Sequence, residues 1–212
     1  FNDDMSKIIG YYQVNEKVVY DDTFKEYFDM GLCSVHGKRI ADELKKKNKR
    51  TFLQIFSDAL SLSSVRPSLF IEKQKRNEHV AIAPFGGERW QGKSLEQKEL
   101  DRFISYLENL GFKYVLLGSG PKLMEYRDHH VVTNSILELA KVIASSRLLV
   151  TADSLALHLA TGTHTDTISF YGPTSAAEID VTPLSRKVVA EEKNYCSYVS
   201  HHMYPSLTAD RL

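Results

Sequence analysis

The sequence predicts an α/β protein whose main part is a doubly wound parallel sheet with helices on both faces. From residue 79 onward, short apolar segments alternate with segments whose apolar residues recur at helical spacing. Several apolar segments end in polar turns that contain glycine, such as Gly118-Ser119-Gly120. Alternating strands and helices imply right-handed crossovers, and ligands of such sheets bind beyond the carboxyl ends of the strands. Function should therefore be sought at that edge.

The elements of this part follow one another in a regular order. About five strands are expected, over residues 79–84, 113–118, 148–152, 167–171 and 187–190. Helices are expected over 95–110, 136–145 and 153–161. Ser94 and Gln97 have the spacing of a capping box for the first of these helices, and Gly111 is suited to end it.

The first 78 residues follow a different pattern. They contain two candidate strands, at 7–12 and 17–20, and a largely helical stretch from 37 to 62. Arg66-Pro67 and the charged run at 72–78 are typical of a linker. We therefore expect three segments: a partial N-terminal domain with its linker at 1–78, the main α/β domain at 79–190, and a C-terminal tail at 191–212.

Composition narrows the classes of partner. The 212 residues contain 27 basic and 27 acidic side chains, so no overall field favours a nucleic acid. No apolar run approaches the ~20 residues that span a bilayer, and the first residues given do not show a basic region followed by an apolar stretch. From these two observations we expect a cytoplasmic protein. The basic run at 45–50 fits a solvated helix face, with peripheral membrane contact as the alternative. Cys33 and Cys196 belong to no Cys-x-x-Cys motif or Cys/His cluster, so we expect free thiols and no bound metal.

The segment around residues 147–175 carries candidate phosphate ligands. An apolar strand ends at Asp153, and Ser154 then opens a helix, where unpaired N–H groups and the positive end of the dipole attract anions. His158 lies four residues further on and shares the helix face of Ser154. The following strand ends at Gly172-Pro173-Thr174. This pattern predicts that a phosphate group binds here.

A second motif offers an alternative phosphate site. Residues 87–94 fit the P-loop spacing G-x-x-x-x-G-K-[ST], and they stand between a strand and a helix. In a P-loop the backbone wraps the phosphates and the serine binds Mg²⁺. Glu88 would bring negative charge into that wrap, and Trp90 is bulky for it. A P-loop would also leave Ser154 and His158 unexplained.

A family resemblance covers more of the chain. Its motifs are Ala83-Pro84-Phe85-Gly86-Gly87, Lys93-Ser94-Leu95, Leu117-Gly118-Ser119-Gly120, Asp153-Ser154-Leu155-Ala156-Leu157-His158 and Tyr171-Gly172-Pro173-Thr174-Ser175. In order and approximate spacing, these motifs resemble the C-terminal nucleotide-sugar-binding domain of glycosyltransferase family 9, the bacterial ADP-heptose:lipopolysaccharide heptosyltransferases. The chain departs from the family pattern at Leu155, where the family has glycine, and at Leu95-Glu96, where the family has Trp-Pro.

The resemblance implies a GT-B fold and an inverting, metal-independent glycosyltransferase that needs no cofactor. The donor would be a nucleotide sugar, ADP-linked and heptose-like, and the acceptor a bacterial glycan, lipopolysaccharide or protein. Residues 1–78 would belong to the acceptor domain, whose catalytic base lies in a segment we expect to precede this chain. We therefore expect a fragment that is inactive alone. A P-loop NTPase and a non-catalytic nucleotide- or sugar-phosphate-binding module remain the alternatives.

The same resemblance implies a set of site residues. Those expected to bind the nucleotide or its diphosphate are Gly86, Gly87, Lys93, Gly118, Asp153, Ser154, Leu155 and His158. Those expected on the donor-sugar side are Gly172, Pro173 and Thr174.

Overall fold

The computed structural model describes residues 12–14, 17–19, 32–63, 66–118, 121–191, 195–199 and 208–212. Contacts between Cα atoms divide the chain into two compact units. The first comprises Phe1–Arg66 with Ala177–Ile179, and the second comprises Pro67–Ala176 with Asp180–Leu212.

The first unit has a two-stranded antiparallel sheet and two helices in its described part. The strands are β1 (Tyr12–Val14) and β2 (Lys17–Val19), and the helices are α1 (Leu32–Lys47) and α2 (Phe52–Ala59). The helical stretch expected at 37–62 is thus divided, because Thr51 begins α2 with a complete capping box to Gln54. The strand expected at 7–12 lies outside the described residues except for Tyr12.

The second unit is built on a six-stranded sheet in which every pair of neighbours is parallel. Its strands are β3 (Val80–Ala83), β4 (Tyr114–Leu117), β5 (His130–Val131), β6 (Leu148–Ala152), β7 (Thr167–Tyr171) and β8 (Arg186–Val189). Its α-helices are α3 (Gln97–Asn109), α4 (Ile136–Ser145) and α5 (Leu155–Thr163). Shorter 3₁₀ helices are η2 (Glu88–Lys93), η3 (Pro121–Tyr126) and η5 (Ala209–Arg211). Of the 3₁₀ helix η4 (Ala176–Glu178), only Ala176 belongs to this unit.

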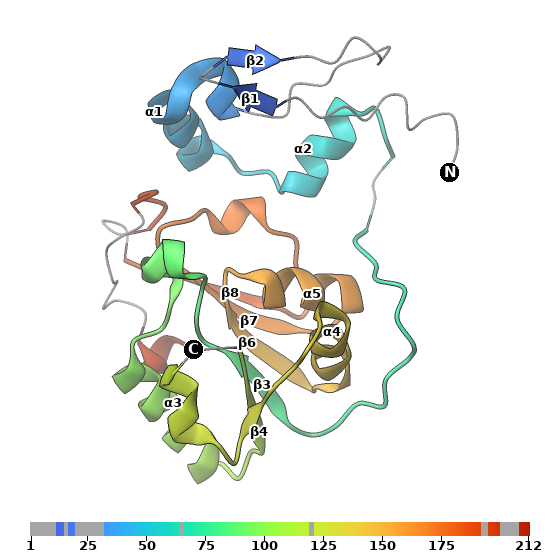
Figure 1. Ribbon diagram of the computed structural model, residues 1–212, viewed down its shortest axis with the longest axis vertical. Helices are drawn as coiled ribbons and strands as arrows, with labels where there is room; N and C mark the ends of the chain where they lie inside the picture. Colours follow the sequence, from blue (N-terminus) through green and yellow to red (C-terminus); the bar gives the residue numbers. More distant parts are fainter. Residues whose placement is uncertain are drawn as a thin grey trace. The chain divides into compact units, whose positions relative to one another are not determined.

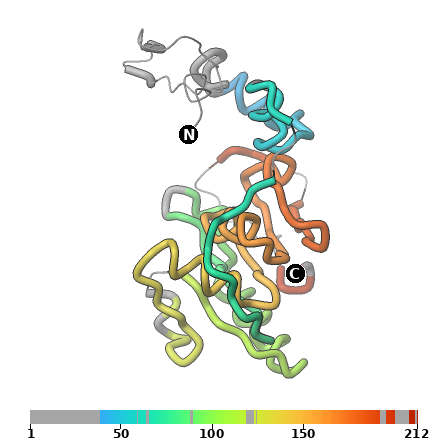
Figure 2. The backbone as a smooth tube through the Cα atoms, turned by 90° about the vertical axis from the view of Figure 1, so that its right-hand side faces the viewer, coloured from blue at the N-terminus to red at the C-terminus, as the bar shows by residue number. Residues whose placement is uncertain are grey.

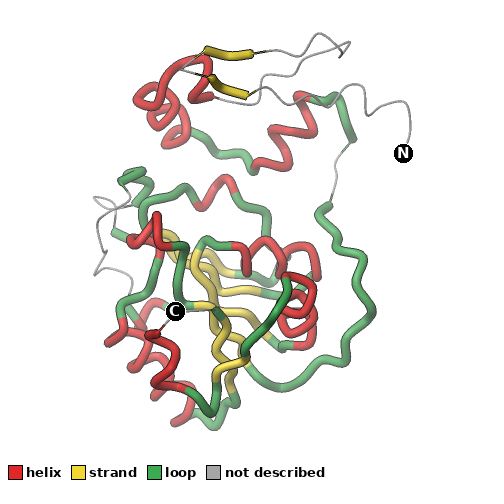
Figure 3. The backbone as a smooth tube through the Cα atoms, in the orientation of Figure 1, coloured by secondary structure: helices red, strands yellow, loops and turns green. Residues whose placement is uncertain are grey.

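Helices cover both faces of this sheet, as the sequence predicts. Figure 1 shows α3 on one side and α4 and α5 on the other, and Figure 3 shows the strands between these helices. Two buried clusters fill the layers. The first joins α3 to side chains such as Ile82 and Val150, and the second joins α4 and α5 to side chains such as Ala81 and Leu149. Because neighbouring strand residues point to opposite faces, both faces are apolar.

The strand order sets the position of the ligand edge. The order is β5-β4-β3-β6-β7-β8, so the chain moves outward from β3 in one direction and then from β6 in the other. Ala83, the last residue of β3, pairs with Thr151 of β6. Loops that follow β3 and β6 therefore flank the point where the order reverses, which is where open α/β sheets bind ligands.

Two sequence predictions for this unit are wrong. The helix expected from residue 95 begins at Gln97 after Glu96, without a capping box. The hydroxyl of Ser94 instead accepts a hydrogen bond of 3.0 Å from the N–H of Gly86. The sheet also contains one strand more than the five expected, because β5 has only two residues and no periodicity to reveal it.

An extended segment at 67–79 lies along the α5 side of the unit (Figure 2). The N–H of Leu69 donates to the carbonyl of Gly162 at 2.7 Å, and Arg76 donates to the carbonyl of His164 at 3.2 Å. A Cβ atom on Gly162 would lie 2.6 Å from Cγ of Leu69, so glycine allows this close approach.

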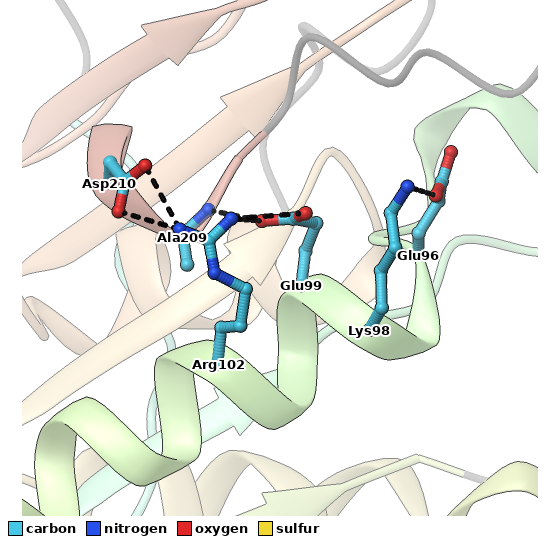
Figure 4. A network of polar contacts seen from close by, with 6 residues as sticks. All are labelled: Glu96, Lys98, Glu99, Arg102, Ala209 and Asp210. Carbon is cyan, nitrogen blue, oxygen red and sulfur yellow. Dashed lines mark hydrogen bonds and ion pairs between the residues drawn. The ribbon is translucent and has the colours of Figure 1, made fainter.

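The end of the chain is anchored on α3 (Figure 4). The buried carboxylate of Glu99 accepts a 2.9 Å hydrogen bond from the N–H of Ala209. Arg102 bridges Glu99 and Asp210, with ion-pair distances of 3.1 and 3.2 Å. The buried acidic group therefore has both a cation and a backbone donor, as burial requires.

A search of the described residues for membrane spans found no helix both long and apolar enough to cross a bilayer.

Candidate functional site

Three polar side chains from separate loops meet at the carboxyl edge of the sheet. Nζ of Lys93 lies 2.7 Å from Oδ2 of Asp153, and the hydroxyl of Thr174 donates to the same oxygen at 2.6 Å. The side chains of Lys93 and Asp153 are only 17% and 9% exposed. Such limited access to water strengthens the Coulombic attraction between the two charges relative to an exposed pair.

The topology explains why these residues meet. Lys93 ends η2 in the loop after β3, Asp153 follows β6, and Thr174 belongs to the turn after β7. These three strands are adjacent and parallel, so their carboxyl ends lie at one edge. Asp153 does not cap α5, whose N-cap is Ser154. The carboxylate is available for the lysine because the helix does not use it.

A glycine fits Lys93 into the loop. A Cβ atom on Gly86 would lie 2.8 Å from Cβ of Lys93, closer than packed side-chain atoms approach. The N–H of Gly86 is also held by the hydroxyl of Ser94. Trp90 adds a cation–π contact, with its ring centroid 5.8 Å from Nζ of Lys93. The loop after β3 is thus shaped around the lysine.

The N-terminal end of α5 lies beside this group. Ser154 is half-buried and makes no side-chain cap, and its hydroxyl lies 3.4 Å from that of Thr151. Leu155, which replaces the glycine of the family pattern, begins the helix with 48% of its surface exposed. His158 is exposed one turn later, so its side chain lies outside the core. Its part in diphosphate binding stays a prediction.

The remaining expected residues divide into two groups. Gly172 and Pro173 are buried in the same turn as Thr174, beside the ion pair. Beneath them Tyr171 is fully buried; this burial, with the nearby Asp153 carboxylate, raises the pKa of its hydroxyl. Gly87 is exposed, with open space around it, and Gly118 follows β4 at φ +129°, where its carbonyl contacts His130. These two glycines contribute backbone to the edge but no side chain to the ion pair.

The loop at 87–94 does not have the geometry of a P-loop. A P-loop helix begins at the lysine, but here residues 88–93 form a 3₁₀ helix with a kink at Trp90, and α3 begins at Gln97. Lys93 pairs with Asp153, and the hydroxyl of Ser94 holds Gly86. The structure therefore gives no support to a nucleotide wrapped by this loop.

Sequence reasoning missed the residues that hold the turn after β7. They lie at 195–199, in the segment we expected to be a tail, and they bond the turn through backbone groups and one tyrosine hydroxyl. No side-chain motif marks a backbone contact of this kind. In the described part of the chain, no group of three or more His, Cys, Asp or Glu side chains is placed to hold a metal ion.

Comparison with protein families gives a match to a segment that contains Asp153 and Thr174. Residues 131–204 match the model of glycosyltransferase family 9 (heptosyltransferase). The chain resembles glycosyltransferase family 9. The family 9 match contains Asp153, Ser154, His158 and the 172–174 turn, whereas Lys93 precedes it. A search among curated proteins gave no match.

Solved structures show the same fold. E. coli heptosyltransferase WaaC with ADP matches at a TM-score of 0.55 and 16% identity, over 74% of this chain and 52% of that one. WaaC with ADP-2-deoxy-2-fluoro heptose matches at a TM-score of 0.53 and 16% identity, over 74% and 51%. The chain thus spans about half the length of these structures. The α/β fold with its parallel six-stranded sheet is that of the GT-B heptosyltransferases.

Proposed function

We propose that this chain carries the donor-binding half of a family 9-like glycosyltransferase. The whole enzyme would transfer a heptose-like sugar from a nucleotide-diphosphate donor to a bacterial glycan, lipopolysaccharide or protein. The observation that carries the proposal is the meeting of Lys93, Asp153 and Thr174 beside the start of α5, at the reversal of the strand order. We place this activity in the cytoplasm, with peripheral membrane contact where the acceptor is a lipid.

These residues can stabilise a departing nucleoside diphosphate. The ammonium group of Lys93 supplies a positive charge, and the N-terminus of α5 supplies N–H donors and the positive end of a helix dipole. An exposed His158 can add a further donor. Fixed donors aimed at developing negative charge lower the barrier to departure of the leaving group.

The proposal also includes metal independence and an inverting outcome. Lys93 would take the charge-neutralising role that Mg²⁺ has in many phosphate sites. Inversion would follow from direct attack by the acceptor hydroxyl, after a base from outside this chain removes its proton. Lys93 and the N-terminus of α5 then hold the leaving group, and no residue of this chain forms a covalent bond with the sugar.

Thermal unfolding with nucleotides tests this proposal. ADP in the presence of EDTA should stabilise the protein by about 2.7 kcal/mol at a hundredfold excess over its Kd. A P-loop NTPase would instead require Mg²⁺ for tight ATP binding. Strict Mg²⁺ dependence would overturn the transferase proposal. Stabilisation by UDP or GDP, but not by ADP, would retain the proposal of a nucleotide-sugar site and would change only the base of the donor nucleotide.

A non-catalytic binding module is the second candidate. The replacement of the family glycine by Leu155, exposed at the start of α5, is the observation that favours it. A module would bind ADP as the transferase does, but the complete open reading frame would support no transfer. Assay of that longer protein with ADP-heptose and a glycan acceptor separates the two.

A further inference from the structure

The turn after β7 is held by a separate segment near the end of the chain. The carbonyl of Gly172 accepts a hydrogen bond of 2.9 Å from the N–H of Cys196, and that of Pro173 accepts one of 2.8 Å from the N–H of Tyr198. We call residues 195–199 the clasp. Both turn residues are buried, so their carbonyls need partners of this kind.

The end of the turn is fixed from two sides. The N–H of Ala176 donates to the hydroxyl of Tyr195 at 2.9 Å, and the carbonyl of Ala176 accepts from Nζ of Lys187 at 2.7 Å. Lys187 is half-buried, and burial lowers its pKa despite the opposing effect of Asp180. Because both backbone groups of Ala176 have side-chain partners, the end of the turn has one defined position.

The clasp contains strained backbone at the residues that hold the turn. Cys196 has φ +56° and Tyr198 has φ +54°, in the left-handed region that side-chain-bearing residues rarely adopt. These are the two residues whose N–H groups bond Gly172 and Pro173. Strain of this kind persists where surrounding contacts determine the conformation, and it gathers at functional sites.

The contacts continue from the clasp to the ion pair. Thr174 lies inside the held turn, and its hydroxyl donates to Oδ2 of Asp153, the oxygen that Lys93 contacts. We propose that the clasp sets the position of Thr174 and, through Asp153, of Lys93, and that Tyr195 is a positioning residue for donor binding. The clasp's role in binding rests on the proposed function.

A pair of tyrosine variants tests the clasp. Tyr195→Phe keeps the ring and removes the hydroxyl that accepts from Ala176. The matched control is Tyr114→Phe, which removes a tyrosine hydrogen bond to Glu108 at the start of β4, away from the carboxyl edge. Two quantities are measured on both variants and the wild type: hydrogen exchange at the Ala176 amide, and the Kd values of ADP and ADP-heptose by calorimetry.

The expected result is faster exchange at Ala176 and about fivefold weaker binding for Tyr195→Phe alone, the effect of one neutral hydrogen bond. Unchanged hydrogen exchange at Ala176 would contradict the claim that Tyr195 holds the turn, whether or not the wild type binds both ligands. Unchanged affinity, with faster exchange, would overturn its role in donor binding. If the wild type binds neither ligand, the proposed function fails, and the role of the clasp in binding fails with it. Hydrogen exchange at the Ala176 amide reports separately whether Tyr195 holds the turn.

Discussion

Lys93 and Asp153 are 60 positions apart in the sequence, yet Nζ of one lies 2.7 Å from Oδ2 of the other. The lysine comes from the loop after β3 and the aspartate from the end of β6, on either side of the reversal in strand order. An ammonium group has three N–H donors. Lys93 can therefore keep its bond to Asp153 while it donates to a phosphate, so the carboxylate holds the cation in place for an anionic ligand.

Two neighbouring glycines give a matched test of how closely this lysine is packed. In Gly86→Ala the new methyl group would lie 2.8 Å from Cβ of Lys93, and the loop must shift. We expect the free energy of unfolding to fall by about 1–3 kcal/mol, which is typical of overpacking, and ADP affinity to weaken about tenfold. Chemical denaturation and calorimetry measure the two effects.

Gly87→Ala is the control for that substitution. In the described part of the chain, nothing lies within 4 Å of its added methyl group, and its φ of −64° suits any residue. Stability and ADP affinity should stay near those of the wild type. Equal losses in the two variants would mean that the loop, and not the packing against Lys93, limits binding.

His158→Ala separates a ligand contact from a core contact. The side chain is exposed, so its removal leaves no cavity and should leave the melting temperature of the free protein unchanged. ADP affinity should fall by about 1–3 kcal/mol, depending on the charge of the imidazole. His129→Ala is the contrasting variant: the ring of His129 stacks on Tyr114 with centroids 4.3 Å apart, so its loss should lower the melting temperature and leave ADP affinity unchanged. A lower melting temperature with unaltered affinity for His158→Ala would contradict this assignment.

Leu155→Gly restores the residue of the family pattern at the start of α5. Removal of the exposed isobutyl group should let a phosphate approach the first helical N–H groups more closely, so ADP should bind more tightly. The glycine should also lower the stability of the free protein by about 0.5–1 kcal/mol. Calorimetry on Leu155→Gly and Leu155→Ala distinguishes loss of the side chain from added backbone freedom. Weaker binding by both variants would show that Leu155 contacts the ligand.

The raised pKa of the Tyr114 hydroxyl implies that the protein becomes less stable at alkaline pH. Burial and its hydrogen bond to Glu108 raise the pKa of its hydroxyl from 10.0 to about 12. Between these values the unfolded chain loses the proton and the folded chain keeps it, so the free energy of unfolding falls as the pH rises. Tyr114→Phe should therefore be less stable than the wild type at about pH 8, and the difference should narrow at about pH 11. A difference that is equal at both pH values would contradict the raised pKa.

The sequence predicted the layers of the second unit well because their signals are local. Residues 136–145, 148–152 and 167–171 have the expected bounds, since each is a long apolar or periodic run. β5 was missed because two residues carry no period. Ser94 was misassigned because its hydroxyl bonds Gly86, a partner eight positions away that competes with capping.

The sequence brings attention to several residues of the carboxyl edge, but it does not predict which of their side chains contact one another. The family resemblance implies Lys93, Asp153 and Thr174 as site residues, and the structure brings these three side chains together. One oxygen of Asp153 contacts both Lys93 and Thr174. This sharing depends on side-chain geometry, which the spacing of motifs in the sequence does not encode. The clasp was missed because its contacts use mainly backbone N–H groups, which every residue except proline carries.

Replacement of Lys93 tests the central claim most directly. ADP is titrated in EDTA into the wild type and into Lys93→Met/Asp153→Asn, a double variant that removes the cation without leaving an unpaired buried carboxylate. Loss of a charged hydrogen bond to the diphosphate should weaken binding by about 1.5–3 kcal/mol, or more than tenfold, while cooperative unfolding is retained. Equal ADP affinity in the two folded proteins would contradict a diphosphate site built around Lys93.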